Sequence, residues 1–237
     1  MFRRPVIVLT LAVLCPLLAA GQAERPATLP ELESAAQRDS LDAGTLYRLA
    51  LGYDLAKRYD DAERVARAAV GVDPRYAPAW LLLAYLPYDR RPKLMKQRAG
   101  LYNEAIDLYR QAVENDIGLY MAHVHLAQIY EDHGMMPQAV AERRAAANAN
   151  PDDGGLLLDL GKTLAHANQW VDAEKALQDA VTANPRDPRP QYYLGIVEQH
   201  QNKVPEARAA FTEFIALAPS RYAAQINDAK QRLSALP

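Results

Sequence analysis

The sequence has little cysteine, glycine or phenylalanine, and neither sign of charge predominates. The single cysteine, Cys15, lies in a segment that we expect to be removed, so no disulfide can stabilise the mature chain. The 27 Lys and Arg residues against 29 Asp and Glu give a formal net charge of −2, without the basic excess typical of nucleic-acid binding. Eleven Gly and three Phe among 237 residues, with alanines frequently in pairs, favour helices over strands. The composition therefore predicts an all-α protein and no nucleic-acid partner.

Signatures of the common enzyme classes are also missing. The chain contains no Gly-rich phosphate-binding loop and no HExxH, GxSxG or CxxC sequence. The main interpretation is therefore a protein that is not an enzyme, with no catalytic residues, no cofactor and no metal.

The N-terminal segment has the pattern of a secretory signal peptide. Two arginines precede an apolar run, Val6–Ala20, and small residues follow it. The run is interrupted by Pro16 and is shorter than the roughly 20 apolar residues that a membrane-spanning helix needs. Leu14 before Cys15 differs from the small residue expected before an acylated cysteine. We therefore expect residues 1–23 to be a signal peptide and the mature protein to be exported, periplasmic or secreted.

Prolines mark an internal repeat of the sequence. Pro151, Pro185 and Pro219 stand at equal intervals of about 34 residues, and each ends a segment of similar sequence. One more interval towards the N-terminus reaches Ile117, whereas Pro74 lies further back than the interval requires, so one unit carries an insertion of nine. The period divides the chain into five units, numbered one to five below: 43–76, 77–119, 120–153, 154–187 and 188–221.

Each unit contains two helical patterns. In unit one, a first helical face carries Leu46, Leu49, Ala50 and Tyr53. The second pattern has small residues, at which two helices can approach closely, and a proline ends it. Those small residues are Ala62, Ala66 and Ala69. This order of large, small and aromatic residues, repeated over residues 43–221, resembles the tetratricopeptide repeat (TPR) family. The resemblance implies a superhelical solenoid of about five helix-turn-helix repeats.

Several positions depart from the TPR pattern. They are Pro87, Ile117, His123, Arg143 and Phe214. The departures bear on local packing, mostly in units two and three, and leave the architecture unchanged.

Polar helices are expected at both ends of the array. Residues 24–42 are predicted to contain a linker and an N-terminal capping helix over 31–42, because Thr28 and Glu31 have capping-box spacing. Residues 222–237 are predicted to form a C-terminal capping helix. Such caps keep a stacked array soluble.

The resemblance implies that the first helices of the units line a concave groove. Several tyrosines fall on that face without being required by the repeat, and tyrosine is enriched at protein interfaces. The alternative is that superhelix packing buries some of these side chains. The residues expected to contact a partner are Tyr47, Leu51, Leu81, Tyr85, Tyr88, Val124, Gln128, Lys162, Tyr192 and Ile196.

The insertion in unit two is basic. It could meet an acidic partner or anionic lipid headgroups, or it could be a solvated loop or part of a longer second helix. The basic residues are Arg90, Arg91, Lys93, Lys96 and Arg98.

A polar column is a further candidate site. Asp132, His166 and His200 recur at the interval of the repeat and so occupy the same place in three successive units. Stacked helices lie roughly 8–10 Å apart, so a bridging metal is one interpretation and hydrated polar residues before a turn the other.

These observations favour a non-catalytic protein–protein interaction scaffold in the bacterial cell envelope. Its partner would be another envelope protein, one segment of which lies in the concave groove. Two alternatives remain at this point: a self-associating structural subunit, and a metal-binding or hydrolytic protein that uses the Asp132, His166 and His200 column. The partner and the oligomeric state cannot be read from the sequence.

Overall fold

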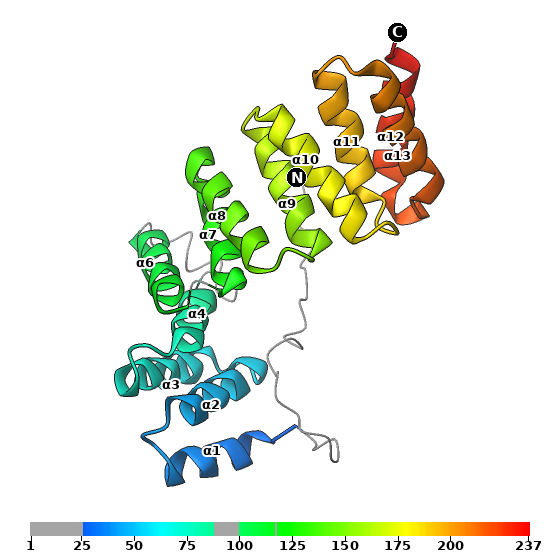
Figure 1. Cartoon of the computed structure of the whole chain (residues 1–237). Helices are drawn as coiled ribbons and strands as arrows, with labels where there is room; N and C mark the ends of the chain where they lie inside the picture. Colours follow the sequence, from blue (N-terminus) through cyan, green and yellow to red (C-terminus); the bar gives the residue numbers. More distant parts are fainter. Residues whose placement is uncertain (1–25, 88–99, 117) are drawn as a thin grey trace.

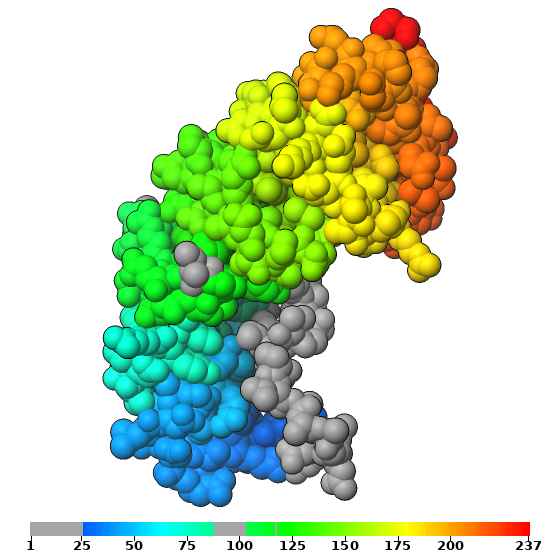
Figure 2. All heavy atoms as spheres, in the orientation of Figure 1, coloured from blue at the N-terminus to red at the C-terminus, as the bar shows by residue number. Residues whose placement is uncertain are grey.

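The computed structural model describes residues 26–87, 100–116 and 118–237, and these residues form helices without any strand. The helices follow one another as antiparallel pairs that stack into a curved array (Figure 1). The space-filling view shows the same array as an arc whose two ends carry the first and last helices (Figure 2). The predicted all-α superhelical solenoid is confirmed.

Five helix pairs make up the array. They are α2 (Ala43–Leu55) with α3 (Tyr59–Val72), α4 (Ala77–Tyr85) with α6 (Gly100–Asn115), α7 (Tyr120–Asp132) with α8 (Met136–Ala149), α9 (Gly154–His166) with α10 (Trp170–Ala183), and α11 (Arg189–His200) with α12 (Val204–Leu217). The first helices of neighbouring units approach each other in two places, α2 with α4 and α9 with α11, and so lie on the inner side of the arc.

Small residues on the first helix allow the close approach of its partner. Gly161 faces Leu177, and Gly195 faces the ring of Phe211, so closely that an added Cβ would lie 2.6 Å from either side chain. In the earlier units, fully buried alanines such as Ala50, on α2, stand at the same position. A glycine therefore accompanies a bulky residue on the second helix, and interdigitation of large and small residues fills the interior.

A left-handed residue connects the two helices of most units. Lys57, Gly134, Asn168 and Asn202 all have φ between 58° and 70°, and all occupy the same place in their own units. The residue after each donates its backbone N–H to the carbonyl five positions earlier, as Lys203 does to Glu198 at 2.9 Å. This bond closes the end of the first helix. Gly and Asn accommodate the left-handed conformation readily, whereas Lys does not.

The N-terminal cap differs in its limits from the expected 31–42. Helix α1 spans Leu29–Arg38, and the predicted capping box forms, with the backbone N–H of Thr28 donating to Glu31 Oε2 at 2.7 Å. Asp42 lies outside this helix because its carboxylate caps α2 instead, accepting from the backbone N–H of Thr45 at 2.7 Å. The observed helix therefore starts and ends earlier than expected. It ends before Asp42 because this residue cannot belong to α1 and also cap the start of α2.

The C-terminal cap is α13 (Ala223–Ala235), which follows a short 3-10 turn, Ser220–Tyr222. Ala229 of α13 packs in a buried cluster with Phe211 and Phe214 of α12. Phe214, a departure from the small residue of the repeat, is thereby accounted for. It fills the space between the last repeat and the cap, where no further repeat follows in the described chain.

Candidate partner-binding surface

Apolar side chains of the first helices of units one to three are half-buried. They are Leu51 of α2, Leu81 and Tyr85 of α4, and Val124 of α7. Except for Val124, these side chains also pack against the large buried cluster of the N-terminal half. Leu51, Leu81 and Tyr85 therefore each have one side held by the core and another that solvent reaches.

Tyr85 belongs to an aromatic stack that the sequence did not reveal. The imidazole of His125 lies parallel to the ring of Tyr109, with centroids 5.1 Å apart, and is tilted against Tyr85 at 5.8 Å. Burial, assisted by the charge of Arg143, lowers the pKa of His125 to about 4. The imidazole is therefore neutral at physiological pH, and it packs as an aromatic ring against Tyr85.

Tyr47 does not line the groove as expected. The residue is 7% exposed, and its ring meets that of Tyr76 edge to face, with centroids 5.7 Å apart. Burial, with a smaller contribution from Tyr76, raises the pKa of Tyr47 to about 12. Tyr76, which lies at the end of unit one in the turn before α4, therefore covers this tyrosine. Tyr47 is thus covered, in contrast to the open groove position that we expected.

Tyr192 and Ile196 hold the C-terminal cap. The Tyr192 ring packs on Phe214 with centroids 5.1 Å apart, and its hydroxyl donates to Asp228 Oδ2 of α13 at 2.8 Å. Burial and this contact with Asp228 raise the pKa of Tyr192 to about 12. Ile196 packs in the same cluster. Both side chains thus serve the packing of α13, in contrast to the open trough that we expected at this end.

The middle of the inner surface is polar. Gln128 donates to Asp132 Oδ1 at 3.1 Å, and Lys162 Nζ donates to Asp159 Oδ1 at 2.8 Å. The Lys162 ammonium also lies 5.8 Å from the ring centroid of Tyr193. Gln128 and Lys162 are both half-buried and are engaged with neighbours of their own helices. The predicted contact residues therefore separate into an apolar part in units one to three and a polar part in units three and four.

Two of the predicted features lie outside the described residues. They are Tyr88 and the basic residues of the insertion, Arg90, Arg91, Lys93, Lys96 and Arg98. A contact of these residues with a partner or with lipid stays a prediction.

A family comparison identifies the repeats. The model of the tetratricopeptide repeat family matches residues 96–154 and 158–224, which together exceed half of the chain. This chain is a TPR protein. A comparison with curated protein sequences found no match.

Solved TPR structures share the fold. YrrB, a TPR protein described as having an unusual peptide-binding site, superposes with a TM-score of 0.69 at 15% identity, over 86% of this chain and 100% of its own. MamA superposes at 0.61 with 17% identity, over 77% of this chain and 94% of its own. Yeast Tom70 superposes at 0.56 with 18% identity, over 88% of this chain and 44% of its own. At these identities the likeness shows the fold alone.

The TPR pattern makes the charged interior of unit three stand out. Arg143 replaces the aromatic residue of the second helix and is 6% exposed. Its guanidinium donates twice to the carboxylate of Glu131, at 3.1 and 3.2 Å, and the Thr163 hydroxyl donates to the same carboxylate. Asp159 of α9 lies 3.9 Å from the guanidinium. A bidentate pair with additional hydrogen bonds is the arrangement that buried ions require.

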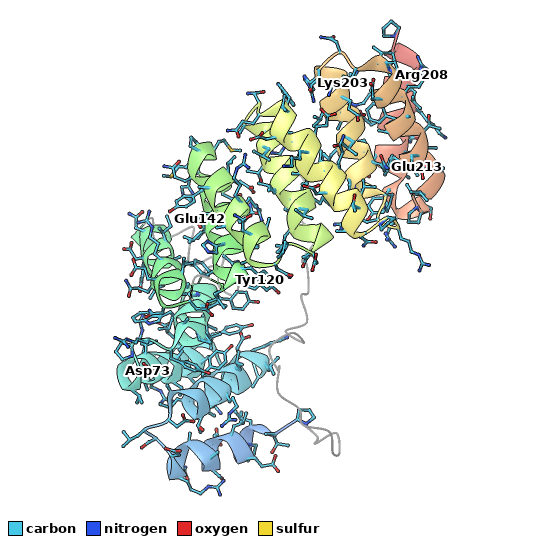
Figure 3. All side chains as sticks on the ribbon, in the orientation of Figure 1. Asp73, Tyr120, Glu142, Lys203, Arg208 and Glu213 are labelled. Carbon is cyan, nitrogen blue, oxygen red and sulfur yellow. The ribbon has the colours of Figure 1, made fainter. Side chains whose placement is uncertain are left out.

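The polar column of the TPR repeats does not form a metal site. Asp132 accepts from Gln128, the His200 ring stacks on Trp170 with centroids 4.3 Å apart, and His166 is exposed at the end of α9. In the described ranges, no group of three or more His, Cys, Asp or Glu residues is arranged to hold a metal ion. His123, another departure from the repeat, lies 2.7 Å through Nδ1 from the Glu142 carboxylate, which is labelled in Figure 3.

Proposed function

We propose that this TPR protein is a non-catalytic scaffold of the bacterial cell envelope that holds a segment of another envelope protein on the inner side of its arc. TPR proteins in general are protein-interaction modules, which supports the binding role. The description of YrrB as having a peptide-binding site concerns that protein, and it makes a peptide segment a reasonable ligand to test here.

One observation carries the proposal. Half-buried apolar side chains continue from α2 across α4 to α7, through Leu51, Leu81, Tyr85 and Val124. Because the core holds most of them in place, a partner would bind with little loss of side-chain freedom. The polar residues Gln128 and Lys162 come next along the arc, so the ligand we propose is an extended segment with an apolar part followed by a polar part.

The envelope location rests on the N-terminal sequence. Residues 1–23 have the charged start, apolar run and small residues of a signal peptide. Within the ranges that the structure describes, every helix falls short of the length and apolarity that crossing a membrane requires. Fractionation of cells and mass spectrometry of the mature N-terminus test the location. An intact Met1 terminus, or an acylated Cys15, would contradict it.

Site-specific photo-crosslinking in intact cells tests the binding surface. A photoreactive phenylalanine derivative would replace Tyr85 or Val124 in one set of variants and Asp107 in the control. Asp107 lies on α6, a second helix, and its side chain is 75% exposed. We expect the first set to capture one partner in high yield and the Asp107 variant to capture little of it.

Two outcomes would change the interpretation. Equal capture from Asp107 and from Tyr85 would place the contact elsewhere on the arc. Capture of a second copy of this chain from Tyr85 would support the self-associating subunit in its place. Helical circular dichroism of each variant confirms that the fold is retained.

A further inference from the structure

Glu198 is buried in the last repeat, and one of its carboxyl oxygens has no hydrogen-bond partner in the described chain. It lies in α11 at the position where α2 has Tyr53, α7 has Tyr130 and α9 has Leu164. The residue is 6% exposed, and its Oε2 atom has no hydrogen-bond partner among the described residues. A carboxylate in such a place is strongly disfavoured relative to the neutral acid. Burial, with the charges of Glu174 and Glu206, raises the pKa of Glu198 to about 7.

The surroundings of Glu198 form the contact between units four and five. Glu174 of α10 accepts from Lys203 Nζ at 2.8 and 2.6 Å and from Gln201 Nε2 at 2.8 Å. Gln201 also donates to the carbonyl of Trp170, at 3.3 Å. Lys203, labelled in Figure 3, lies at the turn between α11 and α12. Glu174 thus ties this turn to the second helix of the preceding unit.

We propose that ionisation of Glu198 near neutral pH loosens the contact between the fourth and fifth repeats. The charged groups that act on Glu198 are Glu174 from α10, Lys203 from the turn and Glu206 from α12. While Glu198 is neutral, Lys203 remains with Glu174. Once Glu198 is ionised, two carboxylates compete for this lysine and a third, Glu206, repels both. The turn is then held less firmly to α10.

The sign of the effect follows from the two protonation states. The pKa of Glu198 is 4.5 in its ordinary state and about 7 in the folded protein, so the folded state binds this proton more tightly than the unfolded chain. Its favourable contribution is complete below about pH 4.5 and is lost as the pH rises through 7. We therefore expect units four and five to separate more readily at pH 8 than at pH 5.5.

Carbon-13 NMR of the glutamate carboxyl groups in the full chain provides the direct test. We expect one glutamate to titrate near pH 7, and we expect that titration to disappear in Glu198→Gln, which keeps the shape of the side chain without its charge. The control is Glu206→Gln, in which the signal should remain with a slightly lower midpoint. If no glutamate titrates above pH 6, or if the signal survives in Glu198→Gln, the proposal is wrong.

Amide hydrogen exchange tests the structural consequence. Wild type and Glu198→Gln are compared at the same pH, so that intrinsic exchange rates cancel. Because opening returns Glu198 to its ordinary pKa of 4.5, we expect amides of α11 and α12 to exchange faster in the wild type by up to about tenfold at pH 5.5 and by up to more than about a hundredfold at pH 8. His200, which stacks on Trp170 beside this contact, is unchanged in both proteins. Equal exchange at pH 8 would overturn the proposal.

Discussion

Units three and five each bury a charged residue at a position where the repeat usually has an aromatic or aliphatic side chain. In unit three, Arg143 pairs with both oxygens of Glu131. In unit five, Glu198 keeps one oxygen without any partner in the described chain. The comparison teaches that a TPR interior tolerates an ion when the adjacent helix supplies its counter-ion. Without one, the pKa of the buried group shifts towards its neutral form instead.

The largest expected effect comes from adding a charge that has no partner at all. Ala105 of α6 is fully buried where the two helices of unit two meet. We expect Ala105→Asp to destabilise the protein by several kcal/mol, because an unpaired carboxylate is forced into a tightly packed interior. Thermal unfolding followed by circular dichroism measures the loss. Unchanged stability would mean that the alignment of unit two with the repeat is incorrect.

Removing the counter-ion from unit three should have the next largest effect. Glu131→Ala removes the bidentate partner of the buried Arg143 guanidinium, leaving only Asp159 at 3.9 Å, and it removes one of the two acceptors of the Thr163 hydroxyl. We expect destabilisation of about 3–5 kcal/mol in chemical denaturation. The matched control is Asp132→Ala, which removes the neighbouring exposed carboxylate and should change stability by less than about 1 kcal/mol. Similar losses in both variants would refute the role given to the pair.

Restoring the apolar residue in unit five should stabilise the protein, in a way that depends on pH. Ionising Glu198 costs up to about 3 kcal/mol, at about 1.4 kcal/mol for each pH unit between pKa values of 4.5 and about 7. Glu198→Leu, which introduces the residue that α9 carries as Leu164, should therefore raise stability at pH 8 more than at pH 5.5. Melting temperatures at both pH values provide the measurement. An equal gain at both would show that packing alone is responsible.

The smallest expected effect concerns the turn that precedes the second helix. Lys57 adopts φ of 59° where unit three has Gly134. Lys57→Gly should stabilise unit one by about 0.5–1 kcal/mol, since glycine adopts this conformation without the clash of a Cβ atom. Denaturant unfolding measures the gain. The control is Lys175→Gly in the exposed middle of α10, which should instead lose about 1 kcal/mol.

Much of the fold could be predicted from the sequence, because the pattern of each helix pair depends on residues close together in the chain and recurs in several units. The equal spacing of Pro151, Pro185 and Pro219 and the alternation of small and large residues both follow from how one helix pair packs. The left-handed turn residues could also have been found, since Asn168 and Asn202 share that spacing. The limits of α1 were not predicted, because Thr28 offered a start whereas the role of Asp42 as the cap of α2 was overlooked.

The accessibility of the expected contact residues was predicted less well. Leu51 and Tyr85 are half-buried, and their contact with a partner stays a prediction. Tyr47 and Tyr192 occupy corresponding places in their own helices, yet Tyr76 covers the first and α13 engages the second. What covers them comes from the turn before α4 and from α13, and the pattern of the first helix alone has no information on either.

The sequence by itself determined the helical class, the period and the positions where paired helices touch, because these depend on the size and polarity of residues at fixed spacing. Only the tertiary structure decided which tyrosines remain accessible, that Arg143 finds Glu131 and that Glu198 finds no partner. Burial and pairing depend on side chains contributed by neighbouring units and by the caps. Corresponding positions in different repeats can therefore have different surroundings.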